Sequence, residues 1–63
     1  MKFIKINGIK IVLDNVLRAE VEENFDGQGE RIQLFAEDSE DPLELLVFDA
    51  ASIQEQIENI ISN

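Results

Sequence analysis

Residues 2–13 read KFIKINGIKIVL, and this stretch carries the strongest local signal in the chain. Asn7-Gly8 supplies the two positive φ angles of a type I′ turn, and β-branched residues flank it on both sides. The stretch therefore predicts a β-hairpin with a two-residue loop. This loop sets the register and gives the hairpin a face expected in the core and an opposite face. The core-facing set is Ile4, Ile6, Ile9 and Ile11, and the opposite set is Phe3, Lys5, Lys10 and Val12.

Residues 14–25, DNVLRAEVEENF, fit two patterns. Leu17 and Val21 follow Leu13 at helical spacing, but Leu17, Ala19 and Val21 also alternate as in a strand. We favour a strand over residues 17–23, preceded by a turn at Asp14-Asn15 and followed by a loop over residues 26–29.

Two further strands are predicted after that loop. Residues 32–36 alternate in polarity, and residues 37–42, EDSEDP, are too charged and proline-marked to continue the strand. Residues 43–48, LELLVF, are apolar on both faces, which is typical of a central strand or of one covered on both sides.

The C-terminal segment predicts an amphipathic helix. Ser52 and Glu55 have the spacing of a capping box, and the isoleucines that follow recur at helical intervals. Its apolar stripe is expected to pack on the sheet, against the isoleucine face of the hairpin. The predicted fold class is α+β: residues 1–63 form a single domain, an antiparallel four- to five-stranded β-meander with one C-terminal helix packed on one face.

Composition limits the functions that the chain can carry. It has no His or Cys, which removes the usual general base and the thiolate nucleophile, so we expect no enzyme activity, no metal and no cofactor. The net charge of −9 argues against direct contact with nucleic acid or with an anionic membrane. No apolar run has the length of a signal peptide or membrane span, so the expected location is the cytoplasm.

The charge is unevenly distributed along the chain. Residues 1–13 contain three lysines and no acid, whereas all fourteen Asp and Glu follow them. One interpretation is head-to-tail electrostatic complementarity between copies, and the other is a solvated acidic surface that keeps the protein soluble. An alternative function is mimicry of nucleic acid, in which a stripe of carboxylates blocks a basic protein partner. The carboxylates of that stripe would be Glu20, Glu22, Glu23, Glu37, Asp38, Glu40 and Asp41.

The predicted sheet has two partly apolar faces, and one helix can cover only one of them. If the helix covers the isoleucine face, the other face presents a second apolar set, which we predict to be a protein interface and the basis of a homodimer or larger assembly. The predicted interface consists of Phe3, Val12, Phe35, Leu46 and Phe48. The alternative is that the sheet curls enough to bury these residues within one chain.

Residues 1–22, MKFIKINGIKIVLDNVLRAEVE, resemble the opening of short uncharacterised bacterial proteins that begin with an Asn-Gly β-hairpin and end in a helix. The resemblance implies the same general layout. It implies no activity and no site residue.

Overall fold

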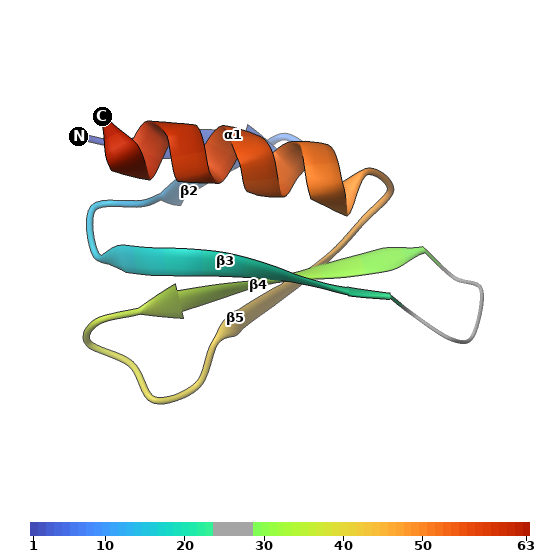
Figure 1. Cartoon of the computed structure of the whole chain (residues 1–63), viewed down its shortest axis with the longest axis horizontal. Helices are drawn as coiled ribbons and strands as arrows, with labels where there is room; N and C mark the ends of the chain where they lie inside the picture. Colours follow the sequence, from blue (N-terminus) through green and yellow to red (C-terminus); the bar gives the residue numbers. More distant parts are fainter. Residues whose placement is uncertain (24–28) are drawn as a thin grey trace.

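The computed structural model describes residues 1–23 and 29–63, which form an α+β structure of antiparallel strands and a C-terminal helix. The elements are β1 (Phe3–Ile6), β2 (Ile9–Val12), β3 (Val16–Glu23), β4 (Glu30–Ala36), β5 (Leu43–Val47) and α1 (Ala50–Ser62). The loop predicted over residues 26–29 lies outside the described residues except for Gly29. Figure 1 shows α1 lying along β3, the hairpin behind the helix, and the two chain ends close together.

The predicted hairpin is confirmed in β1 and β2. Asn7 and Gly8 have φ angles of 53° and 80°, as a type I′ turn requires, and the strands pair in the predicted register. Ile4 and Ile6 of β1 are buried, but Ile9 of β2 is 57% exposed, so its assignment to the core is wrong. The side chains of β1 fill the core, whereas those of β2 lie at its margin.

The strand interpretation of the ambiguous stretch is also confirmed, because β3 pairs with β4 along its length. The register shifts between Val16 and Arg18, which leaves Leu17 in a β-bulge. A bulge resets the alternation of side chains between the two faces. Leu17 is therefore 58% exposed, although Ala19 is buried.

The strands form two sheets and not the single meander that the sequence predicted. The hairpin is a two-stranded sheet, and the other three strands form a second sheet in the order β3-β4-β5. The prediction of a central or doubly covered strand over residues 43–48 is wrong, because β5 is an edge strand with Leu43 and Leu46 49% and 57% exposed. The helix packs on β3 and β4, so it leaves β5 largely uncovered.

The helix begins earlier than the capping box predicts. Asp49 is its N-cap residue and makes no side-chain capping bond, so Ser52 lies inside the first turn and does not cap the helix. The main packing partner of α1 is β3, not the hairpin. Gln54 Nε2 donates to the Ala19 carbonyl of β3 at 2.8 Å, and Lys2 Nζ, from the residue before β1, donates to the Ile61 carbonyl of the helix at 2.9 Å.

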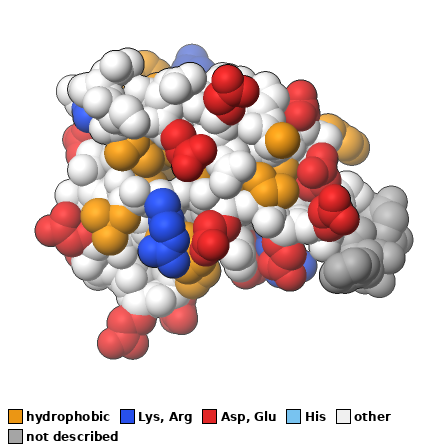
Figure 2. All heavy atoms as spheres, viewed as in Figure 1, with side chains coloured by type: hydrophobic (Ala, Val, Ile, Leu, Met, Phe, Trp, Pro, Cys, Tyr) orange, Lys and Arg blue, Asp and Glu red, His pale blue; other side chains and the backbone are white. Residues whose placement is uncertain are grey.

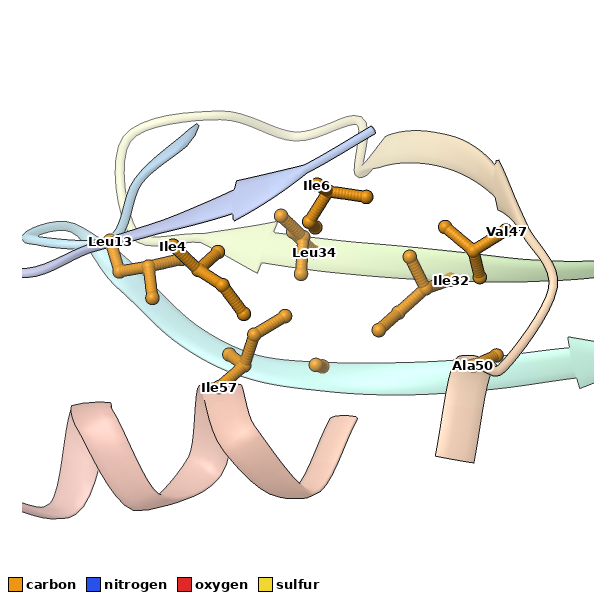
Figure 3. Close-up of a cluster of buried hydrophobic side chains, with 9 residues drawn as sticks. Ile4, Ile6, Leu13, Ile32, Leu34, Val47, Ala50 and Ile57 are labelled. Atoms are coloured by element: carbon orange, nitrogen blue, oxygen red, sulfur yellow. The ribbon is translucent and has the colours of Figure 1, made fainter. Parts of the chain in front are cut away.

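The core lies between the hairpin, the three-stranded sheet and the helix (Figure 3). Leu13, Ile32 and Ile57 are its largest fully buried side chains. Ile4 and Ile6 of the hairpin and Ile57 of the helix belong to the same core cluster, so the isoleucine face of the hairpin does meet the apolar stripe of the helix. Among the described residues, no helix is both long and apolar enough to cross a membrane.

Candidate interaction surface

The outer face of the hairpin combines apolar and basic side chains. Phe3 lies opposite Val12 and Lys5 opposite Lys10, and Lys10 Nζ is 4.6 Å from the centroid of the Phe3 ring. Directly opposed like charges destabilise a strand pair unless an anion or solvent relieves them. No carboxylate in the described part of the chain forms an ion pair with Lys5 or Lys10. This face is a basic patch on an otherwise acidic molecule.

The outer face of the three-stranded sheet is polar at its centre. Arg31 Nη1 lies 3.8 Å from Glu22 and 3.3 Å from Glu44, so it links the two outer strands across β4. Gln33 Nε2 donates to the same Glu44 carboxylate at 2.9 Å. These side chains are partly exposed, and each ion pair contributes roughly 0–1 kcal/mol. Both partners of the Glu44 carboxylate lie on β4, so they hold it on the outer face of the sheet on the β4 side of β5.

The edge of β2 is open. β2 ends the two-stranded sheet, so its outer side has no strand neighbour in the described residues. The N–H of Leu13 donates to the Lys2 carbonyl at 2.7 Å, so Lys2 and Leu13 form a hydrogen-bonded pair of the ladder. Bonded and non-bonded pairs alternate along an antiparallel ladder. The backbone N–H and C=O groups of Lys10 and Val12 therefore point away from β1.

The edge of β5 is open in its first half. The Ala19 carbonyl accepts its bond from α1 and so points away from β4. Bonded and non-bonded pairs alternate along each ladder, and Ala19 pairs with Leu34, which pairs with Leu43. The backbone N–H and C=O groups of Glu44 and Leu46 therefore point to the free side of β5. The Leu46 carbonyl agrees, since it accepts a bond from Asn7 Nδ2 at 3.3 Å. The hairpin turn thus covers this edge at Leu46, and Glu44 has no strand neighbour on that side in the part of the chain that the structure describes.

The five residues of the predicted interface do not form one continuous face. Phe3 and Val12 lie on the hairpin, which does not pair with the sheet that carries Phe35 and Leu46. Phe35 and Leu46 share the outer face of that sheet, but Leu46 pairs with Arg31, four residues or about 13 Å along β4 from Phe35. Phe48 lies in the connection between β5 and α1 and is 91% exposed.

The exposure of these residues nevertheless argues against the alternative in which the sheet curls enough to bury them within one chain. Phe3, Val12 and Leu46 are 43%, 50% and 57% exposed. Phe35 is half-buried, with the Arg18 guanidinium 4.1 Å from its ring centroid. Ile9 and Leu43 are exposed apolar residues outside the predicted interface. Their exposure depends on which strands lie at edges, and no local sequence pattern carries that information.

The acidic side chains do not gather in the stripe that nucleic-acid mimicry requires. Glu20 and Glu22 lie on the outer face of β3, and each forms an ion pair with an arginine, at 3.6 and 3.8 Å. Residues 37–41 lie in the turn after β4, about 13 Å beyond the partner of Glu20. Figure 2 shows acidic side chains scattered over this side of the molecule, with hydrophobic side chains between them.

Within the described ranges, no three His, Cys, Asp or Glu side chains are grouped so that they could hold a metal ion. No protein-family model matches the chain, and no curated protein or solved structure is detectably similar to it, so the geometry above is the basis for any function assigned to it.

Proposed function

We propose that this protein is a small acidic interaction module, which acts by binding and not by catalysis and which self-associates into a dimer or larger assembly. The observation that carries the proposal is the exposure of large apolar side chains. Within residues 1–23 and 29–63, eight of them are at least 43% exposed, against nine buried core residues of which two are alanines. Scattered single apolar residues are normal on a protein surface, but a fold of this size gains from covering so many.

The size of the core supports the same proposal. A domain of about 60 residues buries only about 60% of the surface of its unfolded chain, and small domains commonly gain stability from disulfides, metals or partner chains. The chain has no cysteine for a disulfide. Association of copies would stabilise the fold by burying more apolar area, with no need for a disulfide or a metal.

The described carboxylates support binding over catalysis. None of them is buried, and acid–base catalysis generally needs a carboxyl group in a partly desolvated site. The outer surfaces instead present side chains suited to contact: exposed Leu, Val and Phe beside lysines and glutamates.

The proposal is tested by the solution mass of the chain, measured by light scattering after gel filtration at physiological and at high salt. We expect a mass of at least twice 7.2 kDa for the native chain, and Phe48→Asp tests whether apolar surface at the end of β5 contributes to that association. Phe48 is 91% exposed, so the substitution removes apolar surface without opening the core. Leu17→Asp is the matched control, since Leu17 is also exposed but lies on β3 in a bulge.

Three outcomes separate the alternatives. Loss of association in Phe48→Asp alone, with the native mass unchanged by salt, supports an apolar interface near the end of β5. A native mass that falls at high salt supports pairing of the basic hairpin with acidic surface. A native chain that stays at 7.2 kDa at every concentration and salt refutes self-association.

A further inference from the structure

Two of the strand edges, those of β2 and β5, carry opposite charges. On the edge of β2, the residues whose backbone groups face outward are Lys10 and Val12, and on the edge of β5 the corresponding residue left uncovered is Glu44. Unpaired strand edges are templates for adding a strand from another chain. Joining β2 to β2 with Lys10 opposite Lys10 would set like charges against each other, whereas joining β2 to β5 can set Lys10 opposite Glu44.

We propose that the edge of β2 in one copy pairs with the edge of β5 in a second copy, so that the copies assemble head to tail. This rests on the proposed self-association and names the surfaces that carry it. The pairing is antiparallel and sets Lys10 opposite Glu44 of the second copy. Val12 then faces Pro42. The Pro42 carbonyl accepts a bond from the Val12 N–H, and proline has no N–H of its own that would be left unpaired.

The direction of pairing follows from the backbone. In β2 and in β5, the residues whose N–H and C=O groups point to the open edge also carry their side chains on the outer face of the sheet. Two such edges of L-residues can join with their outer faces on the same side only as antiparallel strands. The joined sheets then have a continuous outer face.

That shared face relieves the charge conflict within the hairpin. Lys5 and Lys10 oppose each other in one chain, and pairing brings the carboxylate of Glu44 next to Lys10. Arg31 and Gln33 already orient this carboxylate from the other side, and a carboxylate has enough acceptor positions for all three partners. The pairing stops before Leu46, so the bond from Asn7 to the Leu46 carbonyl is retained.

Charge exchange tests this arrangement. Lys10→Glu and Glu44→Lys each place like charges opposite one another, and each is expected to raise the dissociation constant at least tenfold. The double variant, and an equimolar mixture of the two single variants, restore opposite charges across the contact and are expected to return to the native mass. Glu58→Lys is the control, because it makes the same charge change on an exposed position of α1.

The measurement is the solution mass against concentration, with far-UV circular dichroism to verify that every variant is folded. Association of the single variants equal to that of the native chain overturns the proposal while leaving self-association intact. The proposal is overturned in the same way if folded single variants lose association and neither the double variant nor the mixture regains it. If Glu44→Lys does not fold, Glu44→Gln takes its place, with a weaker association expected and an unchanged one overturning the proposal. A native chain that is monomeric throughout refutes the self-association as well.

Discussion

The clearest prediction concerns Ile57, through which the helix anchors itself in the core. Ile57 is fully buried, and Figure 3 places it among residues from the hairpin and the sheet. Truncation of a buried isoleucine to alanine costs about 2–5 kcal/mol, from lost burial and the cavity left behind. Alanine is the better helix former, which returns at most about 0.7 kcal/mol. We therefore expect Ile57→Ala to lower the free energy of unfolding by about 2–4 kcal/mol.

This loss is large compared with the stability of a chain of this size. At roughly 0.05–0.15 kcal/mol per residue, a 63-residue domain has about 3–9 kcal/mol in total. A loss of about 3 kcal/mol then corresponds to a fall in Tm of about 12–24 °C. Urea unfolding followed by circular dichroism measures the change, at a protein concentration where the association state of each variant is known.

Two variants make the experiment specific. Ile57→Val keeps most of the side-chain volume and is expected to lose about 0.5–1.5 kcal/mol. Glu55→Ala is exposed on the same helix and is expected to stay within about 0.5 kcal/mol of the native chain. The packing described here is refuted if Ile57→Ala loses less than about 1 kcal/mol, or no more than Glu55→Ala does.

Two other substitutions test the turn and the sheet surface. Gly8→Ala is expected to destabilise the fold by about 1–2 kcal/mol, because Gly8 has a φ of 80°, which alanine rarely adopts, although the space around it is open. Asparagine tolerates that conformation, so Gly8→Asn is expected to lose less stability. Equal losses of the two variants in thermal unfolding would contradict a backbone cause. Arg31→Met removes both ion pairs to Glu22 and Glu44 and is expected to cost no more than about 1 kcal/mol, with the difference from the native chain shrinking in 1 M salt, and a larger, salt-independent loss of stability would show that Arg31 acts through packing instead.

Most of the secondary structure was predictable because local interactions determine it. The Asn7-Gly8 turn has a strong preference for one turn type, and its two-residue loop then sets every cross-strand pair of the hairpin. The isoleucine spacing that predicts the helix is likewise local, and Ile57 is the buried centre of that stripe. The start of the helix was not predictable in the same way, since Asp49 ends the preceding strand connection and caps the helix without a side-chain bond.

The candidate surface was less predictable, because exposure depends on the arrangement of strands. Leu43, Leu46 and Val47 belong to one apolar run, yet the first two are about half exposed and the third is buried. Ile9 lies on the same face of the hairpin as Ile4, but Ile4 is buried in the core, and β2 contributes only the partly buried Ile11 to it. A pattern of apolar residues predicts which face of a strand is apolar, not whether another element covers that face.

The amino-acid sequence by itself determined the hairpin and its register, the C-terminal helix and the separation of basic from acidic residues along the chain, and it favoured a strand over residues 17–23. The tertiary structure alone decided that the strands divide into two sheets, that β2 and β5 are edges, and that Lys10 and Glu44 lie on those edges. The physical reason is range. Turn geometry and side-chain periodicity act over a few residues, whereas sheet order follows from how the whole chain shares one small core among the hairpin, the sheet and the helix.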